Sequence, residues 1–170
     1  VAAVAESLTS PPLWSGWGIR TLAAGQAAYD PLEYHNGTVW PHDNSLIAVG
    51  LALAGRRREV ERVVRALVEA AACFDYRLPE LFAGFDRRAG EPPAEYPSSA
   101  RPQAWAAGTP PLLLQALLGL HPDREARTLR AVAADLPEWV SGLVLDGVHA
   151  FGRRWTVRVE DGAAYVAPAA

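Results

Sequence analysis

Apolar residues recur at helical spacing in the segment 56–74, RRREVERVVRALVEAAACF, with Arg and Glu between them. This spacing places the apolar side chains on one face of an α-helix. The apolar positions are Val60, Val63, Val64, Leu67 and Val68. The preceding segment, SLIAVGLALAG, predicts another helix that begins near Asp43 or Asn44 and ends at Gly55. Because the link between the two helices is very short, we expect an antiparallel helical hairpin over residues 43–74.

The rest of the chain shows other patterns. Residues 75–102 contain five prolines and no sustained periodicity, which predicts a long loop. The segment PQAWAAGTPPLLLQALLGL predicts a further helix, broken or kinked at Pro110 and Pro111. Near the C-terminus, WTVRVEDGAAYV alternates apolar and polar residues around a DG turn, which predicts a β-hairpin over residues 153–167. LVLDGVHA predicts one more strand.

Composition narrows the class of protein. The chain of 170 residues is 50% hydrophobic and 21% charged, which is typical of a globular protein. Its formal net charge of −3 argues against nucleic acid as a partner, and no apolar stretch is long enough for a membrane span. The N-terminal sequence lacks the pattern of a signal peptide, so we expect a cytoplasmic protein. The sequence has no methionine, which predicts that it is part of a longer protein.

Several kinds of chemistry are excluded by the residues that the chain lacks. All sixteen basic residues are Arg, so a Schiff-base lysine or a P-loop lysine is absent. The single cysteine, Cys73, cannot form an internal disulfide, and we interpret it as a buried apolar residue. His35, His42 and Asp43 match no familiar spacing of metal ligands. We therefore expect neither a metal nor a cofactor.

Three segments combine aromatic side chains with hydrogen-bonding side chains: YHNGTVWPHDN, RLPELFAGF and ARPQAWAAG. Sugars require this combination, because the CH faces of a pyranose stack on aromatic rings while its hydroxyls bond to polar groups. Loops that precede successive helices of an array converge on one rim. We therefore predict one cavity lined by residues from three loops, namely His35, Asn36, Trp40, Glu80, Gln103 and Trp105.

Each of these candidates also has a purely structural interpretation. Glu80 follows Pro79, so it is either a general base or sugar ligand, or a first-turn Glu beside a Pro that begins a helix. Asp43 is either a helix N-cap or a pocket residue. Arg20 either pairs with a carboxylate or contacts substrate. Core packing or capping is the alternative for Trp40, Gln103 and Trp105.

The motifs SGWGIRTL, YHNGTVWPHDN, RLPELFAGF and YPSSARPQAWAAGTPPLLLQALLGL occur in this order. In these motifs, over roughly residues 8–150, the sequence resembles the C-terminal glucosidase domain of bacterial amylo-α-1,6-glucosidases, the glycogen debranching enzymes. It is similar, more remotely, to trehalases and processing glucosidases. The resemblance implies a mainly α fold, the C-terminal part of an (α/α)6 barrel of helical hairpins over residues 1–140. Residues 141–170 would form a small β appendage, with the hairpin of residues 153–167 packed outside the barrel.

The resemblance also implies an inverting glycoside hydrolase, in which one carboxylic acid protonates the leaving oxygen and a second carboxylate activates water. Glu80 of RLPELF matches the position of that second carboxylate, the base. The acid, an Asp in the family, belongs to a motif upstream of GWGIRTL that has no match here. We therefore expect the chain to need an N-terminal half for turnover. The residues expected to contact the sugar are Trp17, Arg20, His35, Asn36, Trp40, Asp43, Gln103 and Trp105.

Three functions compete. The first is an exo-acting α-glucosidase for the α-1,6 branch-point glucose of glycogen-like glucans, although related barrels cleave other glycosides such as trehalose or mannosylglycerate. The second is a catalytically inactive relative that binds carbohydrate. The third is a helical interaction module, which a concave pocket lined by Trp40, Glu80 and Trp105 would exclude. Should Glu80 not be the base, Glu95 or Asp43 is the next candidate.

Overall fold

The structure is a computed structural model, and it describes residues 1–169. The chain forms two compact units, one of residues 1–113 and the other from residue 114 onward. The helices in the first unit are α1 (Ala2–Leu8), α2 (Pro41–Leu53), α3 (Arg57–Cys73) and α4 (Ala104–Ala107). Helix α5 (Thr109–Leu118) contains residues of both units. The candidate site lies in the first unit.

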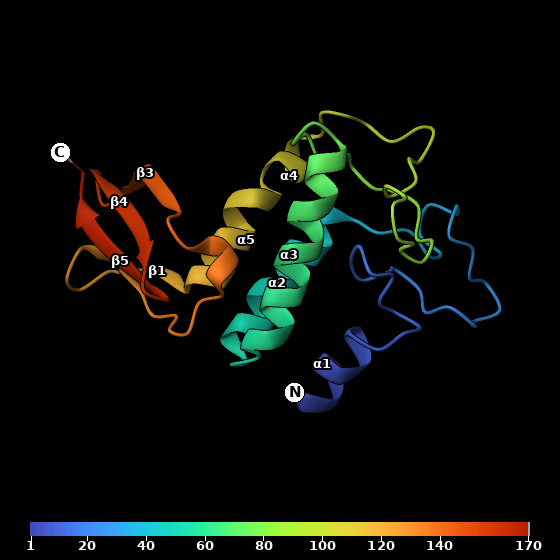
Figure 1. Cartoon of the computed structure of the whole chain (residues 1–170), viewed down its shortest axis with the longest axis horizontal. Helices are drawn as coiled ribbons and strands as arrows, with labels where there is room; N and C mark the ends of the chain where they lie inside the picture. Colours follow the sequence, from blue (N-terminus) through green and yellow to red (C-terminus); the bar gives the residue numbers. More distant parts are fainter. Residues whose placement is uncertain (170) are drawn as a thin grey trace. The chain divides into compact units, whose positions relative to one another are not determined.

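Helices α2 and α3 form the predicted helical hairpin (Figure 1). Four of the five predicted apolar positions of α3 are buried, whereas Val68 is 44% exposed. Each buried aliphatic side chain stabilises the fold by about 1.5–3 kcal/mol. The buried positions are Val60, Val63, Val64 and Leu67. Cys73 is exposed, so its interpretation as a buried residue was wrong. At the last position of α3 it lies beside the buried stripe, which continues through Ala70 and Phe74.

The two ends of α2 follow from local chemistry. The helix begins at Pro41, with Trp40 as the N-cap residue, so the prediction of a start at Asp43 or Asn44 was two or three residues late. Proline suits the first helical position because the N–H it lacks would have no partner there. At the other end Gly55 has φ +71° and its N–H bonds to the Ala52 carbonyl oxygen. The predicted end at Gly55 is confirmed, and the bond pattern is that of a Schellman motif.

Two irregular segments, residues 9–40 and 74–103, surround the hairpin, as predicted for most of the second one. Backbone bridges connect them, and the central one joins Val39 to Phe82. The Val39 N–H donates to the Phe82 oxygen at 2.9 Å, and the Phe82 N–H donates back to Val39 at 3.0 Å. Further along the same segments, a Cβ on Gly84 would lie 1.7 Å from the Gly37 carbonyl oxygen. Only glycine at position 84 therefore permits this close approach.

The predicted helix after residue 102 is divided into α4 and α5, and the break falls at Gly108. Pro110 and Pro111, where the sequence placed the kink, lie in the first turn of α5. Backbone N–H groups of a first helical turn have no partner within the helix, so prolines are tolerated there. The interruption therefore precedes the prolines instead of coinciding with them.

The second unit contains two antiparallel sheets, β1-β2 and β3-β4-β5 (Figure 1). The first pairs β1 (Leu120–Asp123) with β2 (Thr128–Ala131), and the second contains β3 (Val144–Ala150), β4 (Arg153–Glu160) and β5 (Ala163–Pro168). The predicted strand and the predicted hairpin are confirmed as β3 and β4-β5. The β4-β5 turn has φ +49° at Asp161 and +72° at Gly162, as a type I′ turn requires. The β1-β2 hairpin was not predicted, because its strands are short and one contains Pro122.

The described residues form helices followed by small sheets, and an (α/α)6 barrel is not evident among them. The division into residues 1–140 and 141–170, and the place of the C-terminal hairpin outside a barrel, stay predictions. Within residues 1–169, no helix combines the length and the apolar character that crossing a membrane requires.

Asn44 connects the SGWGIRTL segment to α2. Its side chain is 1% exposed. The amide oxygen accepts from the Ile19 N–H at 2.7 Å, and the amide nitrogen donates to the carbonyl oxygens of Ile19 (3.0 Å) and Trp40 (2.9 Å). The Asn44 side chain thus gives Ile19 the hydrogen-bond partners that the backbone of a neighbouring strand would otherwise supply. It holds the SGWGIRTL segment against the start of α2.

We predict that Asn44→Ala lowers the free energy of unfolding by about 2–4 kcal/mol, because it leaves buried backbone groups of Ile19 without partners. Urea denaturation measures this change. Gln26→Ala, which removes an amide at an exposed position, is the control and should change the free energy by less than about 0.5 kcal/mol. Equal effects of the two substitutions would show that the Asn44 bonds do not stabilise the loop.

Candidate functional site

An aromatic cluster lies at the start of α2, with the Trp40 side chain at its centre. Trp40 is 4% exposed, and its indole N–H donates to Thr38 Oγ1 at 2.9 Å and to the Tyr34 carbonyl oxygen at 3.2 Å. The Tyr34 ring meets Trp40 edge-on at 4.8 Å between centroids, and the His35 ring stacks on it at 5.6 Å. Trp105, from α4, contacts it edge-on at 5.8 Å. We call Tyr34, His35, Trp40, His42, Tyr96 and Trp105 the Trp40 cluster.

Glu80 is joined to this cluster through Tyr34. The Tyr34 hydroxyl donates to Glu80 Oε1 at 2.6 Å. This hydrogen bond, with smaller contributions from burial and from the charge of Glu80, raises the pKa of Tyr34 to about 12. The Glu80 backbone is also held, since its N–H donates to the Ala100 oxygen at 2.9 Å. Glu80 lies in an irregular segment and not in the first turn of a helix, so that structural interpretation was wrong.

A cavity of about 620 Å³ adjoins the Trp40 cluster. Its lining residues are Leu8, Leu13, Ile19, Arg20, Thr21, His35, Trp40, Asp43, Asn44, Ile47 and Trp105. The structure therefore brings together five of the expected sugar contacts, Arg20, His35, Trp40, Asp43 and Trp105. Glu80 does not line this cavity and reaches the cluster only through Tyr34. We call it the Trp40 cavity.

The other predicted contacts have structural partners. Gln103 is the N-cap residue of α4, and its side-chain oxygen accepts from the Trp105 N–H at 3.3 Å. Asn36 is half-buried and accepts a backbone bond from Asp30, and it does not line the Trp40 cavity. Asp43 is exposed in the first turn of α2, where a carboxylate is favoured by the helix dipole. Its N-cap interpretation was wrong, whereas it does line the cavity.

Arg20 uses its guanidinium within the protein. Its Nε donates to the Gly84 oxygen at 2.6 Å, and Nη1 donates to the carbonyl oxygens of Pro11 and Pro12 at 3.1 and 3.3 Å. Nη2 pairs with Asp86 at 2.5 Å. The Arg20 side chain is 1% exposed. Of the two interpretations from the sequence, the structure supports the carboxylate pair, and Arg20 connects the two irregular segments.

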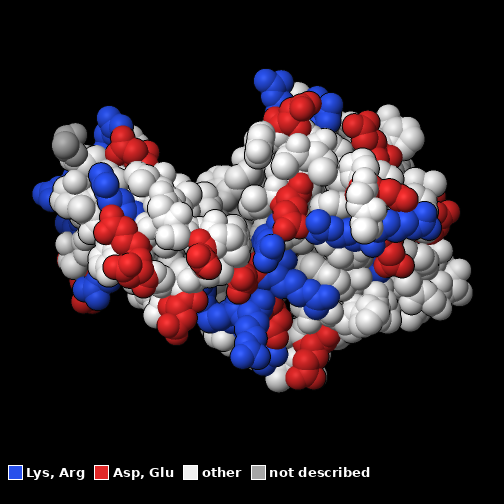
Figure 2. Space-filling model, in the orientation of Figure 1, with Lys and Arg blue, Asp and Glu red and all other residues white. Residues whose placement is uncertain are grey.

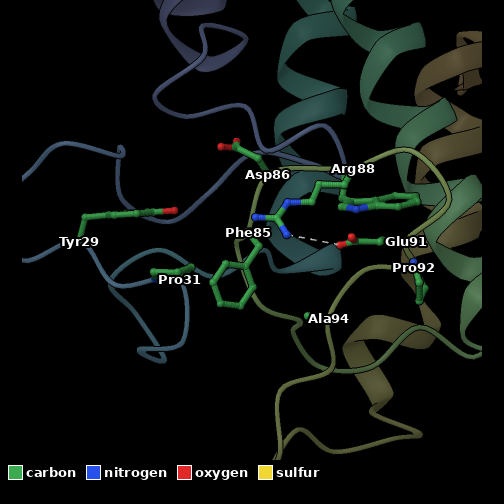
Figure 3. Close-up of a pocket in the computed structure, with 9 residues that line it drawn as sticks. Tyr29, Pro31, Phe85, Asp86, Arg88, Glu91, Pro92 and Ala94 are labelled. Carbon is green, nitrogen blue, oxygen red and sulfur yellow. Dashed lines mark ion pairs between the residues drawn. The ribbon is translucent and has the colours of Figure 1, made fainter.

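Trp17 lies in a different place from Trp40. It lines a second cavity of about 410 Å³ (Figure 3). The remaining lining residues are Tyr29, Pro31, Phe85, Asp86, Arg88, Glu91, Pro92 and Ala94. The guanidinium of Arg87 lies over the Trp17 ring, 3.9 Å from its centroid. The two cavities share no lining residue, and we call this one the Trp17 cavity.

Two further features of the described residues are their potential metal ligands and their surface charge. Within residues 1–169, no group of three or more His, Cys, Asp or Glu side chains is arranged to hold a metal ion. On the face that Figure 2 shows, basic and acidic side chains are interspersed. The charge on that face is therefore mixed in sign.

Three members of the Trp40 cluster were not among the sugar contacts expected from the sequence. Tyr34 directly precedes His35 in the YHNG motif, and its phenol is the type of donor that a carboxylate base requires. The Tyr96 ring contacts Tyr34 at 5.9 Å, and His42 stacks on Trp105 at 5.1 Å. The presence of Tyr34 within a motif already selected for sugar contacts was the available signal. Tyr96 is the first residue of the YPSSARPQAWAAGTPPLLLQALLGL motif, but no local signal indicated its contact with Tyr34, because the long loop brings it to the cluster.

A protein-family model described as mannosylglycerate hydrolase MGH1-like glycoside hydrolase domain matches residues 1–86, about half of the chain. The chain belongs to the MGH1-like glycoside hydrolase family. A search of curated proteins found no match. The expectation of a six-hairpin type glycosidase acting on a carbohydrate is thereby confirmed at the level of the family. The match does not specify a debranching enzyme.

The matched residues of this MGH1-like glycoside hydrolase include most of the candidate site. They contain the whole YHNGTVWPHDN motif and Glu80, whereas Gln103 and Trp105 lie beyond the match. Family membership argues against a helical interaction module, since Tyr34, Trp40 and Glu80 lie within a glycoside hydrolase domain.

We predict that one of the five tyrosines ionises near pH 12, well above the others, in an ultraviolet pH titration. Tyr34→Phe should remove this late step, and Glu80→Gln should move it toward the ordinary tyrosine pKa of about 10. Because folding raises this pKa, the stabilisation by the Tyr34–Glu80 bond is complete below about pH 10 and is lost as the pH rises through about 12. Tyr96→Phe is the control and should leave the late step in place. Ionisation of all tyrosines near pH 10 would contradict the bond.

Proposed function

We propose that this MGH1-like glycoside hydrolase removes glucose from a neutral α-glucoside by an inverting mechanism, with Glu80 as the general base. The hydrogen bond from Tyr34 to Glu80 is the observation that carries the proposal. An inverting base must be ionised and must face a water molecule on the side of the sugar opposite to the leaving group. A phenol that donates to one carboxylate oxygen stabilises the charged form and fixes its orientation. The other oxygen, Oε2, then accepts the proton of the water.

The Trp40 cluster supports sugar binding next to this base. Trp40 itself is buried, whereas the Trp105 side chain is 43% exposed and the His35 side chain is also exposed. An exposed aromatic ring held by buried neighbours offers a rigid stacking surface for the apolar face of a pyranose. The carboxylate of Asp43 in the adjoining cavity accepts hydrogen bonds from sugar hydroxyls.

The second carboxylate of the mechanism has no assigned position in this chain. We propose that the acid, with the remaining hairpins of an (α/α)6 barrel, is supplied by a part of the protein that precedes these residues. The acid and Glu80 would stand roughly 6.5–9.5 Å apart, which leaves room for the attacking water. Residues 1–170 on their own would then bind sugar without turnover.

The substrate that fits the surroundings of Glu80 is uncharged. Tyr34, Trp40 and Tyr96 supply neutral aromatic groups there, and Arg20 has all its donor nitrogens bonded to protein oxygens. A neutral glucan meets these groups without burying an unpaired charge. We propose the α-1,6-linked branch-point glucose of a glycogen-like glucan as the substrate.

Mannosylglycerate is the second candidate, because it is the substrate in the description of the matching family. Its glycerate carboxylate would require a cationic partner. His35 and His42, which stack on Trp40 and Trp105, are the imidazoles of the cluster that could hydrogen-bond to this carboxylate. The two candidates therefore differ in whether the site must bind a carboxylate.

In the full-length protein, Glu80→Gln should lower kcat on an α-1,6-branched dextrin by about 10²–10⁴-fold. The amide keeps the size of the side chain but loses the acceptor charge, and KM should change little because the aromatic groups hold the sugar. Glu95→Gln, at a carboxylate that is 73% exposed, is the matched control and should keep nearly full turnover. Steady-state kinetics of the purified variants provide both values.

Two results would contradict the proposal. Near-normal kcat in the Glu80 variant, with loss in the Glu95 variant, would assign the base to Glu95. Hydrolysis of mannosylglycerate but not of the dextrin by the wild-type protein would favour the second candidate substrate. The role of Glu80 would then be tested by measuring the same two variants on mannosylglycerate.

A further inference from the structure

The Trp17 cavity is lined by aromatic and cyclic side chains that belong to well-fixed loops. Phe85 is 45% exposed, and Figure 3 shows its ring on the same side of the cavity as Pro31 and Tyr29. The Gly84 carbonyl oxygen, directly before Phe85, accepts from the Tyr29 hydroxyl at 3.2 Å and from Arg20 Nε at 2.6 Å. The Gly84 N–H donates to the Pro31 oxygen at 2.9 Å. These bonds lock the cavity walls together, so binding there would cost little ordering of the loops.

Polar groups around the same cavity are free to bond to hydroxyls. Asp86 pairs with Arg20 through Oδ1, and its side chain is 81% exposed, which leaves Oδ2 as an acceptor. Arg88 and Glu91 are 3.8 Å apart and 76% and 62% exposed, so both keep hydrogen-bonding capacity (Figure 3). Two carboxylates and one guanidinium disfavour an anionic ligand. Together with the Phe85 and Tyr29 rings, they match the alternating apolar faces and hydroxyl edges of a neutral pyranose.

We propose that the Trp17 cavity is a second carbohydrate site, which binds a segment of the glucan away from Glu80. The proposal rests on the glucan substrate of the proposed function. Phe85 follows Glu80 by five positions, and five extended residues span at most about 18 Å. One glucan molecule can therefore occupy both places. Once the glucan is bound at one site, its binding at the other site is intramolecular. The second site therefore raises the affinity for long glucans and leaves the affinity for short substrates unchanged.

Phe85→Ala in the full-length protein tests the site by affinity electrophoresis in gels that contain the branched dextrin. The expected result is a dissociation constant about tenfold higher, because the stacking surface is lost. Arg88→Ala should weaken binding severalfold, and its exposed position leaves folding intact. Tyr165→Ala, which removes an exposed aromatic ring on β5, is the matched control and should bind like the wild type.

Kinetics on two substrates separate this site from the catalytic one. With Phe85→Ala, KM for the branched dextrin should rise about tenfold, while kcat and KM for p-nitrophenyl α-glucoside stay unchanged. Retardation in the gel does not require hydrolysis, so it remains informative even if Glu80→Gln proves fully active. Wild-type affinity in both the Phe85 and the Arg88 variants would overturn the proposal. A parallel rise in KM for the short glucoside would also overturn it, by placing Phe85 in the catalytic pocket.

Discussion

The backbone pair between Val39 and Phe82 is the constraint on which the rest of the site depends. Both residues are fully buried, and their reciprocal hydrogen bonds join two segments that are more than forty positions apart in the chain. Beyond this pair, the two segments also lie close together where Gly37 contacts Gly84. Because Glu80 and Tyr34 lie a few residues from this junction, the pair determines that the phenol reaches the carboxylate. Without it, the aromatic cluster and the proposed base would belong to separate loops.

Much of the regular structure could be predicted from the sequence because its causes are local. The apolar spacing from Val60 to Leu67 produced α3, and Gly55 ended α2 through its positive φ. The DG turn at residues 161–162 produced the β4-β5 hairpin. The β1-β2 hairpin was not predicted, because strands of four residues show too little alternation of apolar and polar positions to be recognised. The start of α2 was misplaced because Pro41 begins the helix, whereas the polar residues after it resemble caps.

The site could be predicted only in part, because its geometry depends on contacts between distant segments. The combination of aromatic and polar residues selected Trp40, His35 and Trp105, which do meet around the Trp40 cavity. Nothing in the sequence showed that Trp17 would face a separate cavity. Arg20 likewise could not be resolved from the sequence, since two of its acceptors, the Gly84 carbonyl oxygen and the Asp86 carboxylate, lie more than sixty positions further along the chain. The residue types predicted that this region binds sugar. Which of these residues line the same cavity depends on backbone pairing between distant segments.

The stereochemistry of the first-formed product tests most directly the claim that Glu80 activates water on the face opposite to the leaving group. Time-resolved proton NMR of the full-length protein acting on an α-1,6-branched dextrin distinguishes the two anomers of released glucose before they equilibrate. An inverting reaction yields β-glucose first, with α-glucose appearing only later by mutarotation. Initial release of α-glucose would mean that the configuration is retained. It would contradict the assignment of Glu80 as a base that acts through water.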